Sequence, residues 1–169
     1  RCELLDMIGM KMICDYGNLD DYTIGDTLFM EFHGSETGVE EQAEAVQAIA
    51  AEYGAGDFKW AAKLEDRNKL WEARHNAHYA ILATAQPDQH SMATDVCVPV
   101  SRLAECILAT KEDIEQCGLI SPFVGHAGDG NFHMSIIANY DDNAENKLAH
   151  DVHDRLVHRA MAMEGTCTG

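Results

Sequence analysis

The segment from His126 to His133 constrains the fold of this chain more than any other part of the sequence. It consists of His-Ala-Gly-Asp-Gly-Asn-Phe-His, with apolar residues on both sides. An Asp-Gly pair between apolar runs favours a two-residue β-hairpin turn. A turn at Asp129-Gly130 would place positions 126 and 133 directly opposite each other. The sequence therefore predicts a hairpin with two neighbouring histidines, formed by residues 119–126 and 131–138.

Two imidazoles that face each other across a hairpin can share a divalent cation. Directly opposed residues on one sheet face hold their Cβ atoms about 4.5–5.5 Å apart. Imidazole suits zinc, iron, copper or nickel, and manganese is not excluded. The alternative is two core strands whose histidines are only hydrogen-bonded. Gly125 and Gly128 favour a site, because closely spaced glycines let a ligand or another chain approach the backbone. We therefore expect His126 and His133 to bind zinc or manganese.

Three further blocks of sequence accompany the hairpin: Trp71-Glu-Ala-Arg74-His75-Asn76-Ala77, Thr94-Asp95-Val-Cys-Val-Pro-Val-Ser-Arg-Leu103 and Gly165-Thr-Cys-Thr-Gly169. Together, the four blocks resemble the flavin-dependent D-2-hydroxyacid dehydrogenases of the vanillyl-alcohol-oxidase type. That group includes D-lactate dehydrogenase, the glycolate oxidase flavoprotein subunit and D-2-hydroxyglutarate dehydrogenase. The blocks look most like the D-lactate dehydrogenase branch, including its mitochondrial type, and the first 70 residues fit more loosely.

The resemblance implies that the parent protein oxidises a D-2-hydroxyacid such as D-lactate to the 2-oxoacid and passes a hydride to FAD. It also implies that Arg74 binds the substrate carboxylate and that His126 and His133 are metal ligands. Glycolate or D-2-hydroxyglutarate would be the alternative substrates within this family.

In the family, a flavin-binding domain precedes this region, and the Gly-Thr-Cys-Thr-Gly stretch continues into Glu-His-Gly. That glutamate is a metal ligand, and its neighbouring histidine is the expected catalytic base. We therefore expect residues 1–169 to be a substrate (cap) domain fragment, cut just before this base and inactive alone. FAD would be held mainly by the missing flavin domain, which is the expected partner within the same polypeptide.

The chemistry of Arg74 agrees with this role, because a guanidinium can hold a carboxylate through two parallel hydrogen bonds. On an ordinary surface helix, this arginine would instead pair with Glu65, Glu72 or solvent. Its position three residues after Trp71, on the helical face that also carries Leu64, favours partial burial.

The other polar candidates are weaker. Thr94 and Asp95 lie among apolar strand residues, where Asp95 could equally accept backbone hydrogen bonds at a strand end. Of the two histidines that follow Arg74, His78 is better placed than His75 to face inward. We expect a turn-forming role for Asp129 and a solvated helix face for His150, His153 and His158.

Composition limits the class of partner. The net charge of −17 over 169 residues argues against binding to nucleic acid or an anionic membrane surface. An anionic substrate therefore needs a local cation, either Arg74 or a metal. No segment has the length of an apolar membrane span. The six cysteines contain no Cys-x-x-Cys pair, which indicates free thiols in a reducing compartment, cytoplasmic or mitochondrial.

Hydrophobic periodicity predicts interspersed helices and strands. They are a helix over 2–14, a strand over 27–32, helices over 40–53 and 60–83, a strand over 92–98, a helix capped by Ser101 and ending near 117, the hairpin, and a helix over 142–163. This order predicts an α+β fold with helices packed on one face of the sheet. The family resemblance implies a ferredoxin-like antiparallel sheet.

Two alternatives from other classes remain open. A free-standing metal-binding or regulatory domain would need a third ligand from within residues 1–169. A structural or oligomerisation module would tolerate the loss of both histidines. An isolated substrate domain would also expose the face that packs on the flavin domain, so a homodimer is a further expectation for the isolated chain.

Overall fold

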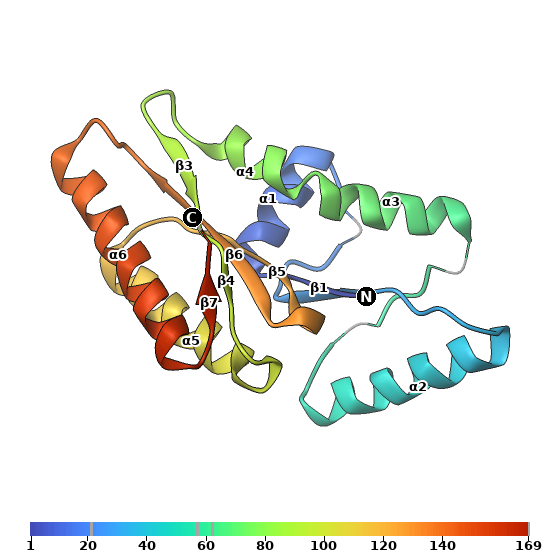
Figure 1. Cartoon of the computed structure of the whole chain (residues 1–169). Coiled ribbons are helices and arrows are strands. Elements are labelled where there is room, and N and C mark those ends of the chain that lie inside the picture. The colour runs from blue at the N-terminus through green and yellow to red at the C-terminus, as the bar shows by residue number, and fades with distance from the viewer. Residues whose placement is uncertain (21, 57, 62, 169) are drawn as a thin grey trace.

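An antiparallel sheet runs through the computed structural model, which describes residues 1–20, 22–56, 58–61 and 63–168 (Figure 1). Its strands are β1 (Cys2–Leu5), β2 (Thr27–Met30), β3 (His90–Ala93), β4 (Val96–Cys97), β5 (Phe123–His126), β6 (Asn131–Ala138) and β7 (Thr166–Cys167). The order across the sheet is β2-β1-β5-β6-β4-β7, and β3 also pairs with β6. Every pairing is antiparallel, which confirms the predicted α+β class.

Helices cover both faces of this sheet, whereas the sequence predicted one. On one face, α5 (Val100–Cys117) and α6 (Asn143–Ala162) pack over a core that includes Phe132, Met134 and Ile136 of β6. On the other face, α1 (Met7–Gly17) and α4 (Ala77–Thr84) pack against Leu5 and Ile137. Successive strand residues point to opposite faces, so the adjacent Ile136 and Ile137 bury different sides of β6.

Two further helices lie away from the α5–α6 layer (Figure 1). α3 (Leu64–His75) continues the line of α4, and α2 (Glu36–Glu52) lies apart from both helical layers (Figure 1). Among the residues of α2, only Ala43 is buried. No helix in the described part of the chain is both long and apolar enough to cross a membrane.

The predicted helix over residues 2–14 is instead a strand followed by a helix. Asp6 separates the two, because its carboxylate accepts hydrogen bonds from the backbone N–H of Gly9, at 2.8 Å, and of Phe123, at 3.1 Å. The first bond caps α1, and the second ties the cap to β5. The apolar spacing of this segment suited a helix, but pairing with β2 and β5 makes Cys2–Leu5 a central strand.

The predicted helix over 60–83 is divided at Asn76 into α3 and α4. The buried positions are Ala73, Ala77, Ala80 and Ile81, so the inward face differs from the predicted one. Small alanines allow α4 to lie close to α1, and their weak apolar signal explains the error.

Two further boundaries differ from the prediction. The strand over 92–98 is interrupted at Thr94-Asp95 and forms β3 and β4. α5 begins after Pro99, and its start has no side-chain cap, so the predicted cap by Ser101 is wrong. The last helix begins as predicted, since Asp142 accepts hydrogen bonds from the N–H groups of Ala144 and Glu145.

Gly130 provides a direct test of the hairpin packing. Gly130 and Gly54 both have φ of +74°, but a Cβ on Gly130 would lie 2.0 Å from the carbonyl oxygen of Val98, while a Cβ on Gly54 meets nothing within 4 Å. Gly54→Ala should therefore cost only the left-handed conformation, about 1–2 kcal/mol. Gly130→Ala should cost about 1–3 kcal/mol more, because of overpacking. Urea unfolding of both variants measures this difference, and equal losses would contradict the packing of Gly130 against the backbone of Val98.

Asp113 joins the two helices of the α5–α6 layer. Its carboxylate accepts hydrogen bonds from Arg155, at 2.7 Å, and from Arg159, at 3.1 Å. The bond from Arg155 is the main reason why the pKa of Asp113 lies below its ordinary value; burial opposes this shift and Arg159 supports it.

We expect Asp113→Asn to lower the free energy of unfolding at neutral pH by about 1.5–3 kcal/mol. Because the folded pKa is depressed, this contribution is present above the ordinary aspartate value of 3.8 and is lost as the pH falls through the folded value. Urea unfolding between about pH 6 and pH 3 should show wild type and variant converging at the acidic end. Glu105→Gln, which breaks an exposed pair with Arg102, is the control and should have a much smaller effect.

Candidate functional site

The hairpin that carries His126 and His133 has a longer turn than the sequence predicted. A 3-10 turn over Ala127–Asp129 and a left-handed Gly130 connect β5 to β6. His126 consequently pairs with Asn131, and His133 pairs with Val124. A shift of two residues keeps both histidines on one face. Their ring centroids lie 5.5 Å apart with the planes at 84°, so the predicted proximity is confirmed for diagonal rather than opposed neighbours.

Both histidines lie on the sheet face that α1 and α4 cover only in part. On this face of β6, Ile137 is buried beneath the helices, while Asn131, His133 and Ser135 are half-buried. The side chains of His126 and His133 are 43% and 35% exposed. The incomplete second layer therefore leaves this end of the hairpin open to a ligand.

The hydrogen bonds of the two histidines define which ring nitrogen carries the proton. Nδ1 of His126 lies 2.8 Å from Oε2 of Glu3, and Nδ1 of His133 lies 3.2 Å from the carbonyl oxygen of Thr94. A carboxylate and a carbonyl only accept, so Nδ1 donates in both rings. In the neutral form of each ring, Nε2 then carries the lone pair. Histidines that bind metals usually have this arrangement, with the second nitrogen donating to a carboxylate or carbonyl.

Glu3 is the centre of the polar cluster beside this hairpin, and the sequence analysis did not single it out. It is only 4% exposed. Its carboxylate accepts hydrogen bonds from Nε of Arg1 at 3.0 Å, Nη2 of Arg74 at 2.8 Å and Nδ1 of His126 at 2.8 Å. Burial alone would raise its pKa, but the hydrogen bond from Arg1 and the positive charge of Arg74 together keep the pKa of Glu3 below its ordinary value. Glu3 therefore stays ionised.

Arg74 reaches this cluster from the last turn of α3. Its side chain is 12% exposed, so the predicted partial burial is confirmed, but its partner is Glu3 rather than Glu65 or Glu72. Burial is the main reason for the lowered pKa of Arg74, and the charge of Glu3 opposes this shift. Among the described residues, Nε of Arg74 is a buried donor without an acceptor.

Positive and negative side chains alternate in this cluster. The guanidinium groups of Arg1 and Arg74 face the carboxylate of Glu3, and the carboxylate of Asp95 lies beside His133. Arg1 also lies over the ring of Trp71, 4.2 Å from its centroid. In a chain with a net charge of −17, these two guanidinium groups bring positive charge together at one place.

Thr94 and Asp95 support His133 from the break between β3 and β4. The hydroxyl of Thr94 accepts a hydrogen bond from the N–H of Met134 at 3.0 Å. Oδ1 of Asp95 lies 2.7 Å from Nδ2 of Asn131 and 3.3 Å from Nδ1 of His133, and Oδ2 accepts from the hydroxyl of Thr168. Burial opposes ionisation of Asp95, yet these side-chain hydrogen bonds keep its pKa below the ordinary value. Asp95 thus orients other side chains of the site.

The other histidine candidates lie elsewhere. His75 and His78 are exposed, and the ring of His78 packs against Tyr79 at 5.7 Å between centroids, so the inward placement predicted for His78 is wrong. The break at Asn76 turns it away from the face predicted for one long helix. On α6, Nδ1 of His158 donates a hydrogen bond to the backbone carbonyl oxygen of Asp154, and this histidine is exposed as predicted. Asp129 is exposed in the turn.

The residues present fit part of a metal site. Both imidazole rings are oriented by the acceptors of their Nδ1 atoms, which leaves the two Nε2 atoms without a hydrogen-bond partner among the described residues. The described residues contain no group of three or more His, Cys, Asp or Glu that could hold a metal ion. His126 and His133 would therefore be the ligands contributed by this part of the chain.

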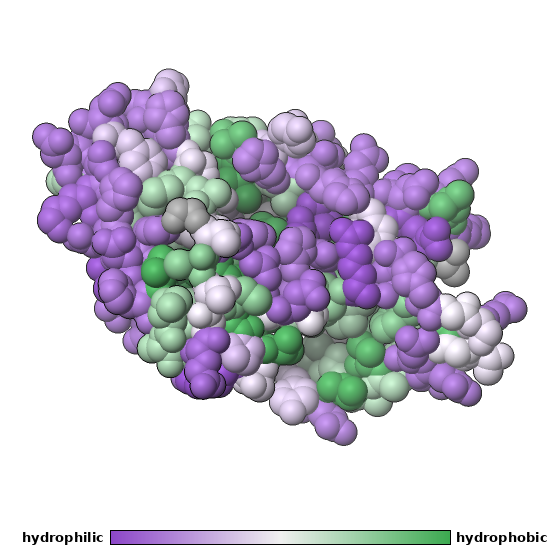
Figure 2. Space-filling view, viewed as in Figure 1, coloured by the Kyte–Doolittle hydropathy of each residue, from purple (hydrophilic) through white to green (hydrophobic). Residues whose placement is uncertain are grey.

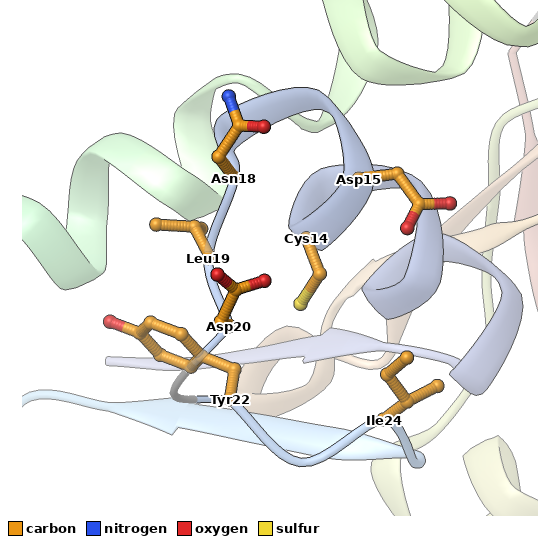
Figure 3. Close-up of a pocket in the computed structure, with 7 residues that line it drawn as sticks. All are labelled: Cys14, Asp15, Asn18, Leu19, Asp20, Tyr22 and Ile24. Carbon is orange, nitrogen blue, oxygen red and sulfur yellow. The ribbon is translucent and has the colours of Figure 1, made fainter.

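Two hollows of the described structure bear on ligand binding. A cleft of about 610 Å³ lies between α2 and the sheet edge, and its wall contains Arg1 together with the acidic residues Glu3, Glu31 and Asp129. Figure 2 shows apolar residues gathered in this hollowed region, whereas α6 and α3 present mostly hydrophilic residues. The second hollow, of about 350 Å³, lies at the end of α1 and is lined by Asp15 and Asp20 without a basic residue (Figure 3). Its charge is unsuitable for an anionic ligand.

Comparison with known proteins identifies the class of domain. The whole chain, residues 1–169, matches the family described as FAD linked oxidases, C-terminal domain. The chain belongs to this family.

Curated relatives of this FAD-linked oxidase domain carry consistent names. The chain is 43% identical to a probable mitochondrial D-lactate dehydrogenase of Danio rerio. It is 38% identical to the mitochondrial D-lactate dehydrogenase (cytochrome) of Arabidopsis thaliana, and both matches cover 100% of this chain. It is 30% identical, over 99% of its length, to a glycolate oxidase subunit of Bacillus subtilis. The chain spans only about a third of these relatives, namely 34%, 30% and 35% of their lengths.

A solved structure shares the fold of this FAD-linked oxidase domain. It is a 4-ethylphenol oxidase from Gulosibacter chungangensis in complex with isoeugenol, with a TM-score of 0.64 at 12% sequence identity. The similarity covers 97% of this chain and 38% of the oxidase chain. At this identity the likeness shows the fold alone.

The tautomers of the two histidines are testable. At about pH 8.5, where a free imidazole is neutral, we expect both rings to carry their proton on Nδ1. Long-range ¹H–¹⁵N correlation spectra of labelled protein distinguish the two ring nitrogens, and His126→Gln and His133→Gln assign the signals. Protonated Nε2 atoms in both residues would contradict the hydrogen bonds to Glu3 and Thr94.

Proposed function

We propose that this chain is the substrate domain of a flavin-dependent D-2-hydroxyacid dehydrogenase that oxidises D-lactate to the 2-oxoacid. The observation that carries the proposal is the cluster on the open sheet face. There, one carboxylate, Glu3, holds both Arg74 and His126, and His133 lies beside them. The names of the relatives from Danio rerio and Arabidopsis thaliana support D-lactate as the substrate.

Each residue has a distinct task in this reaction. Arg74 would bind the substrate carboxylate through its guanidinium group. His126 and His133 would hold a zinc or manganese ion through Nε2. A bound metal would polarise the substrate hydroxyl and carboxylate oxygens and lower the hydroxyl pKa. The two contacts together would fix the α-carbon in one orientation.

The oxidation removes a hydride from the α-carbon and a proton from the hydroxyl. FAD, bound mainly by a separate flavin domain of the same polypeptide, would accept the hydride. The base that takes the proton is expected outside residues 1–169, so we expect this domain to be inactive alone. The names of the relatives also favour a mitochondrial location for the parent protein.

A second candidate is a glycolate oxidase subunit, which the Bacillus subtilis relative at 30% identity favours. A free-standing metal-binding domain has less support, because a third ligand is absent from the described residues. A homodimer of the isolated domain remains a prediction, based on the face that the flavin domain would cover.

Flavin reduction tests the proposal. D-lactate added without oxygen to the full-length flavoprotein should remove the absorbance of oxidised FAD. His126→Ala should slow this reduction by more than about 100-fold, since even the loss of a residue that supports a metal ligand costs 10–100-fold. His158→Ala, at an exposed histidine of α6, is the matched control and should leave the rate unchanged.

Comparison of substrates identifies the acid. Faster reduction by glycolate than by D-lactate would favour the second candidate. Normal FAD binding without reduction by any D-2-hydroxyacid would overturn the dehydrogenase proposal.

A further inference from the structure

We infer that Glu3 is a positioning residue that couples substrate binding by Arg74 to metal binding by His126. This inference rests on the proposed function and assigns a role to a residue that contacts neither the substrate nor the metal. One buried carboxylate would then orient two groups of the site, the guanidinium of Arg74 on α3 and the imidazole of His126 on β5.

Both groups are hydrogen-bonded to the same oxygen atom of Glu3. Nη2 of Arg74 and Nδ1 of His126 each lie 2.8 Å from Oε2 of Glu3. The two donor nitrogens are therefore separated by no more than twice that distance. The other oxygen, Oε1, accepts from Nε of Arg1. A displacement of this carboxylate consequently moves Arg74 and His126 together.

The backbone explains why Glu3 occupies this position. β1 pairs with β5 through Leu4 with Gly125 and Leu5 with Val124, so the next positions along the two strands are 3 and 126. Glu3 therefore belongs to the same sheet as His126 and shares its face. Arg74, near the end of α3, extends to the carboxylate of Glu3, where its guanidinium is mostly buried. The carboxylate thus links the sheet to the α3 helix.

The charge of Glu3 has a different effect on each partner. It keeps the proton of His126 on Nδ1 and so leaves Nε2 available for a metal. It also fixes the guanidinium of Arg74, and Arg1 is a second cation paired with the same carboxylate. A hydrophobic or neutral residue at position 3 would leave Arg74 with an uncompensated charge in a mostly buried place.

Glu3→Gln in the full-length flavoprotein tests the coupling. We expect the affinity for Mn²⁺ or Zn²⁺, titrated into metal-stripped protein, to fall by about 10- to 100-fold. We also expect KM for D-lactate to rise by a similar factor of about 10 or more. In an Arg74→Ala background, Glu3→Gln should raise KM much less, because Glu3 acts on the substrate through Arg74.

Asp113→Asn is the matched control, since Asp113 also holds two arginines but lies in the α5–α6 layer on the other side of the sheet. It should lower the melting temperature and leave KM and metal affinity within about twofold of wild type. Loss of stability alone therefore cannot imitate the effect of Glu3→Gln.

If Glu3→Gln fails to bind FAD or to fold, Glu3→Asp decides the question. It retains the charge but is one methylene shorter, so it should still weaken metal binding and raise KM. Metal affinity and KM that stay within about twofold of wild type in the folded variant would overturn the inference.

The two proposals fail in different ways. If wild-type protein reduces its flavin with D-lactate and only the Glu3 variants are without effect, the coupling is wrong and the proposed function stands. If no D-2-hydroxyacid reduces the flavin, the proposed function fails, and with it the coupling to substrate; the metal titration then still decides whether Glu3 supports His126.

Discussion

The pairing of β5 with β6 is the constraint on which the rest of the structure depends. β6 is hydrogen-bonded to β5, β4 and β3, so most of the sheet is assembled around it. One side of β6 supplies Phe132, Met134 and Ile136 to the core beneath α5 and α6. The other side is buried only at Ile137 and is half-open at His133. The same strand therefore both organises the core and presents the site.

The second helical layer determines where a ligand can enter. α1 and α4 cover one end of the sheet face, and α3 brings Arg74 to the edge of the uncovered part. Glu3 lies at this edge with a buried carboxylate. Burial of that charge is costly without hydrogen-bond donors, which Arg1, Arg74 and His126 supply. Removal of the carboxylate would leave Arg74 without its partner, so the polar cluster forms as a unit.

The site consists of residues that orient other residues. Glu3 fixes His126, and the Thr94 carbonyl with Asp95 fixes His133. Both rings consequently present Nε2, which suits a cation shared between them. This arrangement is more specific than the presence of two nearby histidines, because an unoriented pair would have either nitrogen protonated. It connects the backbone of β1 and the β3–β4 break to the chemistry proposed for the hairpin.

The sequence by itself determined the α+β class, the hairpin, the common face of His126 and His133, and the family, because residue alternation and short motifs are local properties. A register shifted by two residues still left the histidines together, since side chains alternate with a period of two. Only the tertiary structure decided that Cys2–Leu5 is a strand, that helices cover both faces, and that Glu3 holds Arg74. Those features depend on contacts between residues far apart in the sequence, such as Glu3 with Arg74 and Glu3 with His126, and a local sequence pattern does not encode such contacts.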